Sequence, residues 1–145
     1  MMSENGELSP DLHAEIKKLC GDGDLLAESG HFEDAVAQYN KALALIPFPK
    51  NDWEAATWIL AAIADACFLS GLTTSAYEAL QYAMTCPGGI GNPFLHLRLG
   101  QVLLDDGQGD RAADELMRAY MGAGLEIFAA EDARYLIFLK TRAEL

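Results

Sequence analysis

Three segments of the chain repeat one pattern of small and large apolar residues. Each segment begins at a glycine, and these glycines, Gly30, Gly71 and Gly107, lie 41 and 36 residues apart. An alanine comes five residues after each glycine, a large apolar residue nine after it, and a second alanine twelve after it. The three positions are Ala35, Tyr39 and Ala42, then Ala76, Leu80 and Ala83, and then Ala112, Leu116 and Ala119. This spacing puts all three on one helix face, so the pattern predicts repeated helical units.

Local signals predict that each unit is a helix–turn–helix hairpin. A helix-length apolar segment precedes each glycine, and a glycine at the turn takes the positive φ that ends a helix. Ser9 and Pro10 are typical of a helix start, so the first helix is expected over residues 10–29. The second is expected over residues 33–46, where Pro47 stops it. Asn92 and Pro93 predict another helix start.

The pattern resembles the tetratricopeptide repeat (TPR), a unit of about 34 residues with small residues and one aromatic at fixed positions. The first unit matches it well, the third matches without a closing proline, and the second has its proline one place early. The matching residues are Gly23, Ala35, Tyr39, Ala42 and Pro47; Ala64, Ala76, Leu80, Ala83 and Pro87; and Gly100, Ala112, Leu116 and Ala119. Leu19 stands where the family often has tryptophan.

The resemblance implies an all-α fold, a short α-solenoid of three hairpins and a C-terminal capping helix. We expect one domain over residues 1–145, with repeats at about 12–47, 53–87 and 93–124. A loop over residues 48–52 explains the longer first spacing. A final amphipathic helix at about 131–143 is expected to cover the open end of the stack.

Composition limits the classes of partner. The chain is 51% apolar and has a net charge of −12, which disfavours nucleic acid and anionic membrane and favours basic partners. Charge of this size also simply keeps a protein soluble. The sequence has no transmembrane segment, and the start MMSENGELSP lacks the features of a secretory signal. Three widely spaced cysteines, Cys20, Cys67 and Cys86, fit reduced thiols in the cytoplasm.

The sequence contains no arrangement of residues that predicts catalysis. His13, His31 and His96 are scattered, and a surface or packing role is expected for each. The glycine-rich stretch CPGGIGNP lacks the lysine of a phosphate-binding loop and reads as a connection between repeats. The acidic pairs Asp105-Asp106 and Glu131-Asp132 lack calcium-loop spacing and are expected to be solvated. We therefore predict no catalytic, cofactor or metal site, and no enzyme activity.

The TPR resemblance implies that the first helix of each hairpin lines a concave, partner-binding face. Carried over position by position, the resemblance assigns to this face Lys17, Cys20, Asp24, Ala27 and Glu28; Trp58, Ala61, Asp65, Phe68 and Leu69; and Phe94, Leu97, Gln101, Leu104 and Asp105. From these we predict as partner-binding residues Lys17, Asp24, Glu28, Trp58, Asp65, Phe68, Phe94, Gln101 and Asp105. The alternative for the three aromatic residues is a place in the core.

Charge around the middle unit favours a basic protein partner. Residues 51–92 contain four acidic residues, Asp52, Glu54, Asp65 and Glu78, and no lysine or arginine. Members of the family that bind chaperone tails use lysine and asparagine to clamp a carboxylate. Asp24 and Asp65 stand where those asparagines would be, so this sequence departs from the clamp pattern and disfavours a chaperone tail as ligand.

Two hypotheses for function follow, and neither defines an oligomeric state. The C-terminal part, from GNPFLHLRLGQ to YLIFLKT, resembles small stand-alone repeat proteins encoded beside bacterial polymorphic toxins. That resemblance implies an immunity protein that neutralises a basic toxin domain. The alternative is an adaptor or chaperone that holds a segment of a client protein for secretion or assembly.

Overall fold

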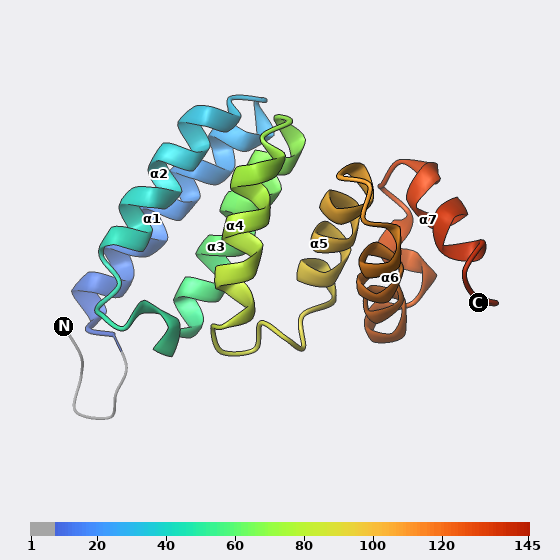
Figure 1. The fold of residues 1–145 in the computed structure, drawn as a ribbon. Helices are drawn as coiled ribbons and strands as arrows, with labels where there is room; N and C mark the ends of the chain where they lie inside the picture. The colour runs from blue at the N-terminus through green and yellow to red at the C-terminus, as the bar shows by residue number, and fades with distance from the viewer. Residues whose placement is uncertain (1–7) are drawn as a thin grey trace. The chain divides into compact units, whose positions relative to one another are not determined.

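The computed structural model describes residues 8–145, and every regular element in that range is a helix (Figure 1). The elements are α1 (Pro10–Glu28), α2 (Phe32–Ala44), η1 (Lys50–Asp52), α3 (Glu54–Leu69), α4 (Thr73–Met84), α5 (Pro93–Asp105), α6 (Gly109–Ala123), η2 (Leu125–Phe128) and α7 (Ala133–Lys140). The predicted all-α class, three hairpins followed by a C-terminal helix, is confirmed. Residues 1–7 of the stretch used to predict the lack of a secretory signal lie outside the described range.

The chain divides into two compact units at the bond between Pro87 and Gly88. Unit 1 holds the first two hairpins, and α2 packs against α3 as well as against α1. In Figure 1, α2 and α4 lie in front of α1 and α3. Unit 2 holds the third hairpin, α5 and α6, together with η2 and α7. The single domain that the sequence predicts over residues 1–145 stays a prediction.

The same turn closes all three hairpins. Gly30, Gly71 and Gly107 have φ of 80°, 82° and 80°, the left-handed conformation that glycine adopts without strain. The amide of the residue after each glycine bonds back to a carbonyl five residues earlier: His31 to Leu26, Leu72 to Cys67, and Gln108 to Leu103, at 2.8–2.9 Å. These are Schellman caps, and they confirm the predicted helix ends.

Side chains satisfy the free backbone groups at other helix ends. The Ser9 hydroxyl accepts from the Leu12 amide at 3.3 Å, and the Asn92 Oδ1 accepts from the Phe94 amide at 2.9 Å, which confirms both predicted helix starts. At the end of α2, Lys50 Nζ donates to the carbonyls of Leu43 and Ile46 at 3.0 and 2.7 Å. The inserted loop therefore supplies the cation that caps the helix before it.

Small residues let the helices of a hairpin approach closely. A Cβ atom added to Gly23 would lie 2.6 Å from the Tyr39 ring, and one added to Gly100 would lie 2.7 Å from the Leu116 side chain. In the middle hairpin, the residues at the corresponding positions, Ala64 and Leu80, are both fully buried. The small residue in the first helix and the large one in the second thus fill one layer of core in each hairpin.

Substitution of Ala112 by phenylalanine tests this packing. Ala112 is 0% exposed between α5 and α6, so the larger ring has to displace its neighbours. We expect the free energy of unfolding to fall by about 1–3 kcal/mol or more, measured by urea denaturation. The control is Ala37→Phe at an exposed position of α2, which should cost well under about 1 kcal/mol. Equal losses of unfolding free energy for the two variants would contradict the close packing at Ala112.

Candidate functional site

The candidate site is the surface of unit 1 formed by the predicted partner-binding residues of two helices, which we call the α1/α3 face. It comprises Lys17, Cys20, Asp24 and Glu28 of α1 and Trp58, Asp65, Phe68 and Leu69 of α3. Lys17, Asp24 and Glu28 are exposed, whereas Cys20, Asp65 and Phe68 are half-buried. The face therefore joins charged groups to apolar groups that solvent still reaches.

Trp58 has the largest apolar side chain on this face. Its side chain is 62% exposed, although it lies in a helix whose other apolar residues are mostly buried. Asp65 and Leu69 follow at seven and eleven residues, which places them on the same side of α3. An exposed tryptophan is the kind of residue on which protein interfaces concentrate their binding energy.

A buried tyrosine donates a hydrogen bond to one aspartate of the face. Tyr39 is 3% exposed, and its hydroxyl donates to Asp24 Oδ1 at 2.6 Å. Burial, that hydrogen bond, and the charges of Asp24, Cys20 and Asp65 all raise the pKa of Tyr39 well above its ordinary value. The hydroxyl therefore stays a proton donor, and the aspartates of α1 and α3 both act on it.

The repeat pattern predicts a packing position for Tyr39 and does not indicate this polar role. The ring does pack in the hairpin core, against Gly23. The equivalent positions in the other hairpins are Leu80 and Leu116, which have no hydroxyl. A tyrosine where the repeat otherwise has leucine was the available signal, because a buried hydroxyl needs a partner.

In unit 2, the predicted residues of α5 contact the C-terminal segment of the same unit. Gln101 is 0% exposed, and its Nε2 donates to Glu131 Oε1 at 2.8 Å. Asp105 accepts from Arg134 Nη1 at 2.6 Å and from the Tyr135 hydroxyl at 2.9 Å. These contacts are internal to unit 2, and the other six of the nine predicted partner-binding residues lie on α1 and α3.

Phe94, the third predicted aromatic, is half-buried in the same network. The Arg98 guanidinium lies 4.9 Å from its ring centroid and bonds to both Gln101 and Glu131. The prediction that the Glu131-Asp132 pair is solvated is wrong for Glu131, whose side chain is only 15% exposed. A carboxylate at this position is stabilised because Arg98, 33 residues earlier, is buried opposite it.

The three cysteines are protected thiols. Cys67 and Cys86 are buried and Cys20 is half-buried, and burial raises the pKa of each, with the Asp24 charge adding to the effect at Cys20. At neutral pH we expect iodoacetamide to modify all three more slowly than free cysteine, with Cys20 reacting first. Mass spectrometry gives the rates, and unfolding in urea should make them equal. Fast labelling of Cys67 in the folded protein would contradict the described burial.

Residues 8–145 offer no grouping of three or more histidine, cysteine or acidic side chains suited to a metal ion. Within the same residues, no helix has both the length and the apolar character that a membrane crossing requires.

No family model matches the sequence, and no curated protein matches it in sequence. Solved structures do match its fold. The Yersinia enterocolitica type III secretion chaperone SycD, in complex with a peptide of the translocator YopD, has a TM-score of 0.68 at 18% identity, over 87% of this chain and 90% of SycD. PcrH from Pseudomonas aeruginosa has a TM-score of 0.69 at 18% identity, over 97% and 98% of the two chains.

A third matched structure is a domain that itself contains tetratricopeptide repeats. The C-terminal TPR-containing domain of a Plasmodium falciparum FK506-binding protein has a TM-score of 0.70 at 11% identity, over 96% of this chain and 93% of that domain. At these identities the likeness is one of fold. The chain therefore has a TPR-like fold, as its sequence pattern predicts.

Proposed function

We propose that this chain is a protein-binding module that acts as a chaperone or adaptor, holding a segment of a client protein on the α1/α3 face. The observation that carries the proposal is the position of Trp58, exposed on the same helix face as Asp65. Asp24 of α1 accepts a hydrogen bond from Tyr39, and the Asp65 charge also acts on that hydroxyl. The likeness to SycD supports it, because the matched SycD structure contains a bound peptide.

The chemistry of the face defines the client segment. Asp24 and Asp65 attract a lysine or arginine, and residues 51–92 contain no basic side chain that would compete for it. Trp58, Phe68 and Leu69 offer apolar contact to a neighbouring side chain. The proposed client segment therefore carries a basic residue close to a large apolar residue.

Fluorescence-labelled synthetic peptides test this proposal. One peptide carries arginine and leucine in a polar background, and matched peptides replace arginine by glutamate or leucine by serine. We expect the first to bind the full chain in a polarisation assay and both replacements to weaken binding about tenfold or more. Equal affinity for all three peptides would overturn the proposed recognition.

The immunity-protein hypothesis uses the same acidic face with a folded toxin domain. The SycD likeness favours the chaperone or adaptor hypothesis, since the partner there is a peptide. Affinity purification from the host, followed by mass spectrometry, identifies a partner. If an unstructured segment of that partner binds as tightly as the whole protein, the immunity hypothesis fails. If only the folded domain binds, the chaperone hypothesis fails.

A further inference from the structure

The first hairpin connects a donor in its core to a carboxylate on its surface. The hydroxyl of Tyr39, on α2, donates to Oδ1 of Asp24, on α1, at 2.6 Å. Tyr39 is 3% exposed, whereas Asp24 is an exposed residue of the α1/α3 face. The hydrogen bond therefore runs from a buried side chain to one of the charged groups that the proposed client contacts.

Close packing sets the position of the Tyr39 hydroxyl. A Cβ atom added to Gly23 would lie 2.6, 2.9 and 3.0 Å from three carbon atoms of the ring. A ring packed this closely cannot swing toward α1 without a collision, and the core of the hairpin surrounds its other sides. Burial, followed by the hydrogen bond to Asp24, also raises the pKa of Tyr39, so the hydroxyl keeps its proton at neutral pH. Tyr39 is therefore a fixed donor beside α1.

A fixed donor limits the freedom of the Asp24 carboxylate. An exposed aspartate on a helix can exchange between staggered χ1 rotamers. When such a side chain binds a partner, the loss of this freedom opposes binding. In Asp24 the hydrogen bond from Tyr39 favours one orientation before any partner arrives. The carboxylate is thus ordered when the hairpin folds, and the partner does not have to order it.

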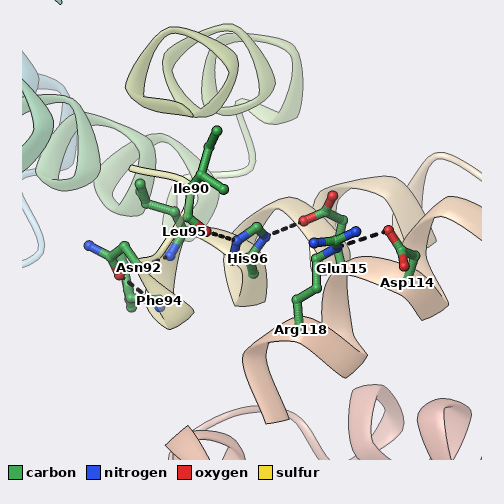
Figure 2. Close-up of polar contacts among 8 residues, drawn as sticks. All are labelled: Ile90, Asn92, Phe94, Leu95, His96, Asp114, Glu115 and Arg118. Atoms are coloured by element: carbon green, nitrogen blue, oxygen red, sulfur yellow. Dashed lines mark hydrogen bonds and ion pairs between the residues drawn. The ribbon is translucent and has the colours of Figure 1, made fainter. Parts of the chain in front are cut away.

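The other two hairpins have leucine at the position of Tyr39. Leu80 and Leu116 pack in the core but have no hydroxyl to donate. In the third hairpin the helices make a polar contact at different positions, where Nδ1 of His96 lies 2.5 Å from Oε2 of Glu115 (Figure 2). A core hydroxyl that holds a carboxylate of the α1/α3 face is therefore a feature of the first hairpin.

We propose that Tyr39 is a positioning residue for client recognition, whose hydroxyl holds the Asp24 carboxylate in the orientation that receives the basic side chain of the client. Tyr39 is buried and acts through Asp24. The inference rests on the proposed function and deepens it, because it assigns selection of the basic residue to the first hairpin. The hydroxyl raises affinity for a positive charge and leaves the contact with the apolar residue of the client unchanged.

Tyr39→Phe in the full chain tests this role, since it removes the hydroxyl and keeps the ring beside Gly23. We expect its affinity for the arginine–leucine peptide to fall about threefold to tenfold in the polarisation assay. Its affinity for the peptide with glutamate in place of arginine should stay that of wild type. The matched control is Tyr82→Phe, which removes the hydroxyl of an exposed tyrosine on α4 and should bind both peptides as wild type does.

A double-mutant cycle separates positioning from a general structural effect. In an Asp24→Ala background, Tyr39→Phe should cause no further loss of affinity, because the carboxylate that it positions is gone. Asp22→Ala, at an exposed aspartate of the same helix, should leave the effect of Tyr39→Phe intact. Wild-type affinity of Tyr39→Phe for the arginine–leucine peptide would overturn the proposal. An equal loss with and without Asp24 would overturn it as well.

NMR of the free chain gives a readout that does not depend on any peptide. The Hα–Hβ couplings of Asp24 should show one χ1 rotamer in wild type and an average over rotamers in Tyr39→Phe, while those of Asp22 stay the same in both. Averaged couplings of Asp24 in wild type would overturn the proposal, even if the variant fails to fold. If wild type binds no arginine-containing peptide, the proposed function fails, and the couplings alone decide whether Tyr39 positions Asp24.

Discussion

Replacement of Glu131 by alanine is expected to lower the free energy of unfolding by about 3–5 kcal/mol. Arg98 is 6% exposed and is held between Glu131, Gln101 and the ring of Phe94. Without the carboxylate, its buried charge loses the ion pair with Glu131, and Gln101 Nε2 loses the hydrogen bond to Glu131 as well. Urea denaturation followed by circular dichroism measures the loss.

Two further variants separate the buried pair from a general effect of losing a carboxylate. Glu126→Ala removes an exposed carboxylate from η2 and should change stability by less than about 0.5 kcal/mol. The double variant Arg98→Met with Glu131→Leu removes both charges and should recover most of the loss, since an apolar pair of similar volume needs no counterion. A double variant as unstable as Glu131→Ala would show that loss of the Arg98–Glu131 ion pair is not the cause.

The second large effect concerns binding. Trp58→Ala combined with Asp65→Lys should weaken binding of the arginine–leucine peptide by several kcal/mol, about a hundredfold or more. The first change removes the exposed aromatic surface, and the second places a positive charge where the proposed client carries one. Fluorescence polarisation measures the affinity, and circular dichroism should remain helical.

The matched control for the charge reversal is Glu78→Lys. Glu78 is exposed on α4, outside the α1/α3 face, and its reversal changes the net charge by the same amount. We expect it to lower affinity only slightly and to do so less at higher salt, since its effect is long-range attraction. If the two reversals weaken binding equally, total charge governs binding and the α1/α3 face does not.

The hairpins and their turns were predictable because their signals are local. Gly30, Gly71 and Gly107 each close a hairpin through bonds to residues within five positions, and Ser9 and Asn92 start helices through their own side chains. The two-unit division was not predicted. The repeat pattern runs across Pro87, and the sequence carries no mark of the boundary beyond the two glycines that follow it.

The polar network of unit 2 was not predictable from spacing. Glu131 meets Arg98 across 33 residues, and Tyr135 meets Asp105 across 30, through a fold-back of the segment that leads into α7. The sequence predicts the final helix but not which side chains of α5 it contacts. The TPR resemblance predicts that three residues of α5 bind a partner, namely Phe94, Gln101 and Asp105. These three residues instead lie in or beside contacts made within unit 2.

Because Gly23 packs closely against Tyr39, a substitution in this part of the core also affects the surface residue Asp24. A side chain larger than glycine at position 23 demands a smaller ring or no ring at position 39. Losing that tyrosine would also remove the hydroxyl that orients Asp24. Homologues are therefore expected to vary at positions 23, 39 and 24 together, so that a mutation selected for stability would also alter the chemistry of the α1/α3 face.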